Sequence, residues 1–168
     1  RVADVAGIAI AGGYSVGRSG CWAVGDDYGH PWNSPFAARF PEAVVIGSDQ
    51  VADLDGEPLG KPGTHERATG QLRRMRGNTV IFQTALAVVC RQSGFEQVDL
   101  APVNVRFRPL SDEEIEAYLL AEMPYDCAGS AKSEGLGIAL LESIDSDDPT
   151  ALVGLPLIRT CRMIRAAG

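Results

Sequence analysis

Two long apolar stretches with a turn between them constrain the fold more than any other part of this sequence. Residues 79–91 and 95–108 are rich in β-branched and aromatic side chains, and Ser93-Gly94 separates them. Over residues 103–108 apolar side chains alternate with polar or basic ones, which is the period of a strand that buries one face. The sequence therefore predicts two long neighbouring strands joined by a tight turn.

Capping residues and periodic apolar positions predict three helices. Thr64 can cap a helix over residues 65–76, and a glycine follows at the position where helices commonly stop. Ser111 begins a capping box, which predicts a second helix to about residue 122. The last helix is expected over about residues 155–166, with a proline in its first turn.

Two shorter apolar runs complete the pattern of elements. Residues 43–47 have the length and composition of a buried strand, and residues 138–141 predict another. Strands and helices in this order, with two long strands adjacent, indicate an α/β (mixed α+β) domain built on a mixed sheet. A chain of 168 residues accommodates one such domain.

Charge and composition exclude several classes of function. The formal net charge of −7 argues against broad binding to nucleic acid or to an anionic membrane. No apolar run is long enough to span a bilayer, so we expect a cytoplasmic protein. The four cysteines form no C-x-x-C pair and there are two histidines, so a bound metal would be a hard cation such as Mg²⁺ or Mn²⁺ on oxygen ligands.

Asp49 and Lys61 are the first candidates for chemistry. Asp49 comes directly after the strand predicted at 43–47, where a carboxylate can take a proton from water or hold a divalent cation. Lys61 lies between a glycine and a proline, so it can reach a phosphate as a compact charge. The alternatives are an aspartate that forms a turn and a lysine that is merely solvated.

A small, polar loop over residues 127–135 is the second candidate site. Its small residues expose backbone N–H groups, Lys132 adds positive charge, and Glu134 could read a base edge through its acceptor oxygens. An ordinary surface loop is the alternative. Arg106 and Arg108 could face a phosphate, but we expect them to face solvent or to pair with glutamates.

Known nucleotide-binding and hydrolase motifs are missing from the sequence. There is no G-x-x-x-x-G-K-[ST] loop and no G-x-G-x-x-G segment after a strand. No G-x-S-x-G elbow is present either. P-loop, Rossmann and serine-hydrolase interpretations are therefore disfavoured.

Several motifs in order resemble those of the Maf-type nucleoside triphosphate pyrophosphatases. They are IGSDQV, DGEPLGKP, FRPLSDEEIEAY, CAGSAKSEGLGI and DPTALVGLPL, and the resemblance covers about residues 36–168. It implies an elongated mixed sheet flanked by helices with a central cleft, as in the Maf and ITPase folds. It also implies a small-molecule nucleoside triphosphate as partner, with no nucleic acid or membrane, and leaves a homodimer open.

The S-D-Q and K-S-E-G segments resemble the branch of that family that acts on 7-methyl-GTP. On this resemblance Asp49 and Lys61 are catalytic, with Asp49 as proton acceptor and as the contact to a divalent cation, Mg²⁺ or Mn²⁺. Lys61 and Lys132 would hold phosphate, and Gln50 and Glu134 would select the base. A metal-assisted water would attack the α-phosphate and release pyrophosphate.

Residues 1–35 depart from the family pattern. The S-x-S-x-x-R turn at the start of the first helix is missing, and its nearest echo is residues 13–18. We interpret residues 1–35 as an atypical, disordered or frame-shifted segment, in which the N-terminal strand and helix are missing or non-native. A divergent terminus and a truncation are the alternatives, and the abrupt transition near residue 36 favours the shifted frame. Two alternative functions follow: a remnant that binds nucleotide without hydrolysing it, and a dTTP or UTP pyrophosphatase.

Overall fold

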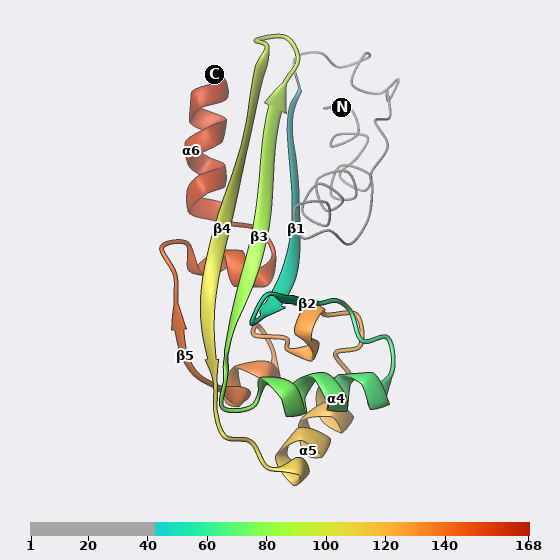
Figure 1. The fold of residues 1–168 in the computed structure, drawn as a ribbon. Helices are drawn as coiled ribbons and strands as arrows, with labels where there is room; N and C mark the ends of the chain where they lie inside the picture. The colour runs from blue at the N-terminus through green and yellow to red at the C-terminus, as the bar shows by residue number, and fades with distance from the viewer. Residues whose placement is uncertain (1–42) are drawn as a thin grey trace. The chain divides into compact units, whose positions relative to one another are not determined.

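The computed structural model describes residues 43–168, in which five strands form one sheet in the order β2-β1-β3-β4-β5 (Figure 1). The strands are β1 (Val44–Leu54), β2 (Glu57–Leu59), β3 (Thr79–Cys90), β4 (Phe95–Phe107) and β5 (Leu141–Asp145). The α-helices of this part are α4 (His65–Met75), α5 (Asp112–Glu122) and α6 (Leu157–Ala167). Three 3₁₀ turns lie at Ala128–Ser130, Leu136–Leu140 and Pro149–Val153. The predicted α/β class is confirmed.

Neighbouring strands of this sheet run in opposite directions. β1 pairs antiparallel with β2, and β4 pairs antiparallel with β5. The arrows of β1, β3 and β4 also alternate in direction (Figure 1). Short turns connect β1 to β2 and β3 to β4, and only antiparallel strands can be joined so tightly. Among residues 43–168 the sheet is therefore antiparallel, whereas the sequence had suggested a mixed one.

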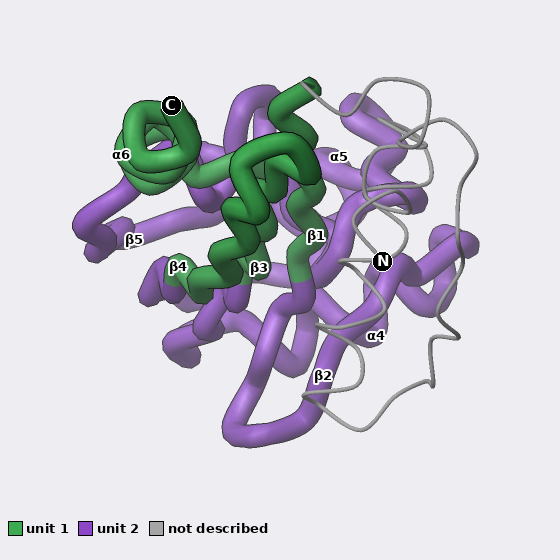
Figure 2. The backbone as a smooth tube through the Cα atoms, turned by 90° about the horizontal axis from the view of Figure 1, so that it is seen from above, with its two compact units in different colours: residues 1–50, 84–101, 154–168 green, residues 51–83, 102–153 purple. Residues whose placement is uncertain are grey.

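The chain divides into two compact units (Figure 2). Among the described residues, one unit comprises 43–50, 84–101 and 154–168, and the other comprises 51–83 and 102–153. The long strands contribute residues to both units, because the division falls within β1, β3 and β4.

The first unit is built around the C-terminal half of β3. Every residue from Thr84 to Cys90 is buried. Leu86 and Val88 pack against Met163 of α6, which places the apolar stripe of that helix on one face of the strand. Burial on both faces explains why this part of β3 is a continuous apolar run and not an alternating one.

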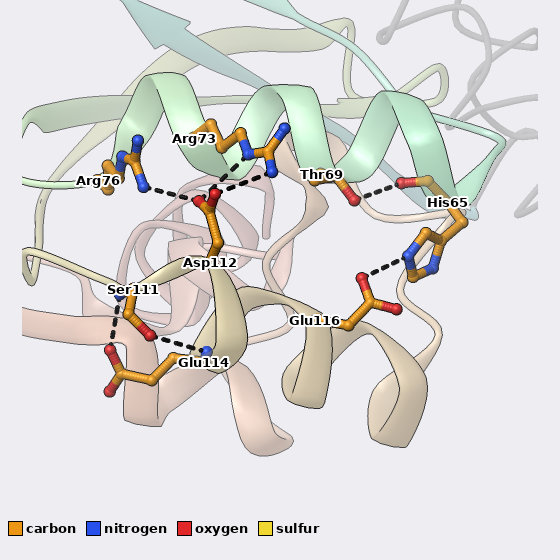
Figure 3. A network of polar contacts seen from close by, with 8 residues as sticks. All are labelled: His65, Thr69, Arg73, Arg76, Ser111, Asp112, Glu114 and Glu116. Carbon is orange, nitrogen blue, oxygen red and sulfur yellow. Dashed lines mark hydrogen bonds and ion pairs between the residues drawn. The ribbon is translucent and has the colours of Figure 1, made fainter.

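The second unit contains α4 and α5, which are tied together by ion pairs (Figure 3). Asp112, the first residue of α5, accepts from Arg73 Nη2 at 3.0 Å and from Arg76 Nη1 at 2.9 Å. A second contact links the two helices at the start of α4, where His65 Nε2 lies 2.9 Å from Glu116 Oε2 of α5. Apolar side chains fill the unit's interior, among them Leu72, Met75, Phe82, Phe107, Ile115 and Leu119.

The predicted helix boundaries agree with the structure to within about two residues, although the proline expected in the first turn of the last helix, Pro156, is its N-cap. Thr64 Oγ1 accepts from the Arg67 amide and so caps α4. Ser111 and Glu114 form both bonds of the capping box that begins α5. Asp55-Gly56 turns the chain between β1 and β2 with positive φ at both residues, the conformation that favours Asp-Gly in hairpins.

Two predicted strands were placed wrongly. β1 does not end at residue 47 but continues to Leu54, because its distal part pairs with β2. Residues 138–141 do not form a strand: residues 136–140 form a 3₁₀ turn, and β5 begins at Leu141. A run of four apolar residues cannot by itself distinguish a strand from a buried turn, and pairing with β4 decides where β5 starts.

Candidate functional site

The centre of β1 carries Ser48, Asp49 and Gln50 on alternating faces of the strand. Asp49 therefore points away from the other two side chains. The sequence placed Asp49 after the end of a strand, which is wrong, since it lies in the middle of β1. This position is more rigid than a loop, because the backbone on both sides is part of a strand.

Asp49 is exposed, and no hydrogen bond or ion pair of its carboxylate is found within residues 43–168. Ser48 and Gln50, on the other face, have protein partners. Ser48 Oγ lies 2.8 Å from Ala85 O and 2.7 Å from Gly154 O, so its single proton serves one carbonyl at a time. Gln50 Nε2 donates to Thr84 Oγ1 at 3.0 Å. Asp49 is thus the side chain of this segment that is open to a ligand.

Lys61 belongs to the second unit and lies in the loop between β2 and α4. Its side chain is exposed, and it forms no ion pair within the described residues. The backbone around it is held at two points. Gly60 O accepts from Gln71 Nε2 of α4 at 3.0 Å, and Gly63 N donates to Tyr125 O at 2.9 Å. An exposed lysine side chain therefore projects from a stretch of backbone that is held on both sides.

Lys132 and Glu134 lie in the loop between two 3₁₀ turns, also in the second unit. Lys132 is paired, since its Nζ lies 3.2 Å from Glu122 Oε1 at the end of α5. The Lys132 amide donates to Tyr118 Oη at 3.0 Å. Glu122 Oε2 in turn accepts from the Leu136 amide at 2.7 Å. The loop is therefore attached to α5 at both ends.

These contacts shift the titration of the groups around the loop. The hydrogen bond to Glu122 and the charge of that carboxylate raise the pKa of Lys132. The bond from the Leu136 amide, followed by that from Lys132, lowers the pKa of Glu122. Burial raises the pKa of Tyr118 to about 12, so its hydroxyl stays protonated near neutral pH. Lys132 and Glu122 are accordingly both charged across the physiological range.

Two glycines allow the loop to lie this close to its neighbours. A Cβ on Gly137 would come within 2.5 Å of Lys132 O and 2.6 Å of Lys132 N. A Cβ on Gly135 would come within 2.6 Å of Glu122 Oε2. Gly137 is therefore required by packing against backbone, whereas a Cβ at Gly135 would have to displace the end of the Glu122 side chain. The sequence had marked the small residues of this loop only for the N–H groups that they expose.

The predicted residues thus fall into two groups. Asp49 and Gln50 are neighbours in the first unit, with side chains on opposite faces of β1. Lys61, Lys132 and Glu134 belong to the second unit, where Gln71 of α4 contacts both lysine-bearing loops.

Sequence reasoning missed three residues of the second unit: Gln71, Tyr118 and Glu122. The sequence marked residue 122 only as the approximate end of a helix and assigned no functional role to Tyr118. Tyr118 and Glu122 are four residues apart on α5, and this spacing places both on one helical face. That spacing was the one signal that could have revealed them together.

The expectation for Arg106 and Arg108 is confirmed. Arg106 Nε lies 3.3 Å from Glu142 Oε2, and Arg108 Nη2 lies 3.0 Å from Glu114 Oε1. Both guanidinium groups are thus paired with glutamates at the surface of the second unit and are poor candidates for a phosphate site.

No cluster of three or more His, Cys, Asp or Glu side chains suited to a metal ion occurs within residues 43–168. A closed protein cage for a metal is therefore not found in this part. Mg²⁺ commonly binds through one or two carboxylates together with substrate phosphates and water, and the unpaired Asp49 carboxylate fits that donor set. In the same part of the chain, no helix has the length and apolar character needed to cross a membrane.

Comparisons with known proteins agree with this architecture. A family model described as Maf-like protein matches residues 32–167. A protein named 7-methyl-GTP pyrophosphatase from Polaromonas sp. (strain JS666) is 80% identical over 132 residues, which are 79% of this chain and 60% of that relative. One of the same name from Albidiferax ferrireducens is 76% identical over 79% of this chain and 66% of its own length. A third, from Aromatoleum aromaticum, is 62% identical over 79% of this chain and 68% of its own length. The chain thus spans about two thirds or less of the first two relatives.

Proposed function

Because the chain belongs to the Maf family, we propose that it hydrolyses 7-methyl-GTP to 7-methyl-GMP and pyrophosphate. The observation that carries the proposal is the name 7-methyl-GTP pyrophosphatase on relatives that are 80% and 76% identical. The catalytic domain in this proposal spans residues 36–168. All the candidate residues lie within the 32–167 segment that the family model matches.

Asp49 is proposed as the group that accepts a proton from the attacking water. Its carboxylate is exposed and unpaired within residues 43–168, so it is available to a water molecule. Its place in β1 fixes the backbone, which lowers the cost of orienting a general base.

Lys61 and Lys132 are proposed to neutralise the triphosphate. Lys61 is exposed and can reach a ligand with little rearrangement of its loop. Lys132 is paired with Glu122, so it must exchange that carboxylate for a phosphate oxygen, or bind both. Lys61 therefore has a positive charge that no described carboxylate neutralises, whereas the positive charge of Lys132 is partly neutralised by Glu122.

Glu134 and Gln50 are proposed to select the base. The exposed Glu134 carboxylate can accept from the ring N–H and exocyclic amine of guanine. It also favours a base that carries the positive charge of 7-methylation. Gln50 is bonded to Thr84, so contact with the base requires its amide to exchange that partner or to bind both.

A divalent cation, Mg²⁺ or Mn²⁺, is proposed to bind through Asp49 and the phosphates of the substrate. When bound, it would neutralise charge on the phosphates and assist ionisation of the attacking water. The protein's own share of the reaction is to hold the phosphates with the two lysines and to accept the proton at Asp49.

The test is pyrophosphate release from 7-methyl-GTP, GTP, dTTP and UTP, measured with Mg²⁺ and with Mn²⁺. We expect 7-methyl-GTP to be the preferred substrate and Asp49→Asn to reduce turnover at least 100-fold, the lower range for a lost general base. The matched control is Asp145→Asn, which removes an exposed carboxylate from another strand and should leave turnover unchanged. Normal turnover in Asp49→Asn would refute the role of Asp49.

The pyrophosphate-release assay, together with a calorimetric titration of nucleotide, separates the two alternative functions. A calorimetric titration that shows nucleotide binding without pyrophosphate release would identify a binding protein and overturn the proposal. Preferred hydrolysis of dTTP or UTP would keep the reaction but replace the substrate.

A further inference from the structure

A single side chain, Gln71 of α4, contacts the two loops that carry Lys61 and Lys132. Its Nε2 donates to Gly60 O at 3.0 Å, and its Oε1 accepts from Ser130 Oγ at 2.5 Å. Gly60 directly precedes Lys61, and Ser130 lies two residues before Lys132. The two loops are far apart in sequence, and this one amide bridges them.

The orientation of the Gln71 amide follows from its partners. A backbone carbonyl can only accept, so the amide nitrogen must face Gly60 O. The remaining oxygen then faces Ser130, whose hydroxyl can donate. Exchanging the two ends of the amide would place two acceptors against each other, so Gln71 has one satisfied arrangement.

The Ser130 end of this bridge is constrained. Ser130 is fully buried and has a φ of +57°, a conformation that side-chain-bearing residues rarely adopt. Gly129 precedes it with a φ of +66°, and a Cβ there would lie 3.1 Å from Ala52 Cβ. A buried hydroxyl needs a partner, and Gln71 provides it. The bond therefore stabilises the strained backbone from which the Lys132 loop departs.

The Lys61 end is constrained in a complementary way. The carbonyl that Gln71 holds belongs to the peptide unit joining Gly60 to Lys61. After Lys61 the chain is held again where Gly63 N donates to Tyr125 O. Without Gln71, the nearest backbone anchor before Lys61 would be Leu59, the last residue of β2, which pairs with Ala52 of β1.

We propose that Gln71 is a positioning residue, which ties the Lys61 loop to the Lys132 loop so that both ammonium groups meet the same triphosphate. The inference rests on the proposed function for what the lysines bind, but the tether itself rests on the two hydrogen bonds of Gln71. Gln71 acts through the lysines and does not itself contact the reacting atoms.

The decisive variants are Gln71→Met, which keeps the length of the side chain and loses both bonds, and Gln71→Glu. The glutamate can still accept from Ser130 but presents an oxygen to Gly60 O. Phosphate is bound in both the ground state and the transition state, so we expect Gln71→Met to raise KM for 7-methyl-GTP roughly fivefold, with little change in kcat. Thr69→Val is the matched control, since Thr69 bonds only within α4 among the described contacts.

A double-mutant cycle with Lys61→Ala distinguishes positioning from general support of the fold. If Gln71 acts through Lys61, Gln71→Met should have a smaller effect on KM in the Lys61→Ala background. An equal effect in both backgrounds would contradict positioning, even if both proteins are less stable.

Hydrogen exchange of the full chain provides a readout that does not depend on activity. We expect Gln71→Met to speed exchange in the segments around both Gly63 and Lys132, and Gln71→Glu to do so mainly around Gly63. Unchanged exchange in both segments would overturn the tether. If the unaltered chain releases no pyrophosphate, the proposed function fails, while the exchange result still decides whether Gln71 couples the two loops.

Discussion

Glu122 forms an ion pair with Lys132 and, through its other carboxylate oxygen, accepts a hydrogen bond from a backbone amide. Its Oε1 lies 3.2 Å from Lys132 Nζ, while its Oε2 accepts from the Leu136 amide at 2.7 Å. The Glu122 side chain is only 13% exposed, compared with 41% for Lys132. The charge of Lys132 is therefore already compensated before a ligand arrives.

Removing the charge of Glu122 should strengthen the binding of phosphate. Glu122→Gln keeps an acceptor for the Leu136 amide but no longer neutralises Lys132. We expect the affinity for inorganic pyrophosphate to rise about two- to fivefold, the range for a partly exposed ion pair. Isothermal titration calorimetry measures this, with Glu116→Gln on the same helix as control. An unchanged affinity would mean that Lys132 does not face the phosphates.

Gly137 should be intolerant of a side chain. Because a Cβ there would come within 2.6 Å of the backbone of Lys132, Gly137→Ala must displace the loop. We expect the free energy of unfolding to fall by about 1–3 kcal/mol, as is usual for overpacking. Urea denaturation provides the measurement.

Gly70→Ala is the matched control for that substitution. A Cβ at Gly70 has open space around it, and the residue lies within helix α4. Alanine should stabilise the protein by roughly 0.5–1 kcal/mol there, since glycine disfavours a helix interior. A Gly137→Ala variant as stable as the unaltered chain would show that the loop does not pack as described.

Acid should weaken the link between α4 and α5. The hydrogen bond from Arg73, together with the charges of Arg73 and Arg76, lowers the pKa of Asp112 below its ordinary value of 3.8. A carboxyl whose folded pKa is lowered contributes stability above its unfolded pKa, and that contribution is lost as the pH falls through the folded value.

Asp112→Asn should therefore flatten the loss of stability below about pH 4. Urea midpoints between pH 2 and pH 6 provide the comparison. Arg73→Met removes the largest cause of the shift and should flatten the same part of the curve. If the Asp112→Asn curve stays parallel to that of the unaltered chain, the ion pair contributes nothing to the acid transition.

Glu134 should determine the preference for the methylated base. Glu134→Gln keeps one acceptor oxygen and loses the charge that favours a cationic base. We expect the ratio of kcat/KM for 7-methyl-GTP over GTP to fall roughly tenfold, the scale of a hydrogen bond to a charged group. Glu142→Gln, at an exposed carboxylate paired with Arg106, is the control. An unchanged ratio would favour the dTTP or UTP alternative.

The expected homodimer and cytoplasmic location stay predictions.

The local elements of the fold were predictable because their causes lie close together in sequence. The capping box needs only residues 111–114, and the Asp55-Gly56 turn needs two. The alternation over 103–107 likewise predicted the buried face of β4, where Val103, Val105 and Phe107 are fully buried. In each case the signal, a pair of capping residues, a turn or an alternation of side chains, lies within a few neighbouring residues of the sequence.

The family was also readable from the sequence alone, since several ordered motifs carry it, and the matching family model confirms it. The position of Asp49 was not readable, because the extension of β1 past it depends on the neighbouring strands β2 and β3. Candidate functional residues can be found by residue type, whereas the environment of each depends on strands and helices that are distant in sequence.

The sequence by itself determined the residue types, the helix caps, the turns and the family of this protein. Only the tertiary structure decided that Lys132 is neutralised by Glu122 and that Gln71 joins the two lysine loops. The physical reason is distance along the chain: Ser130 and Gln71 are 59 residues apart in sequence, and no local pattern encodes a bond between them. The charge that a side chain presents to a ligand is set by such partners, and folding alone brings them together.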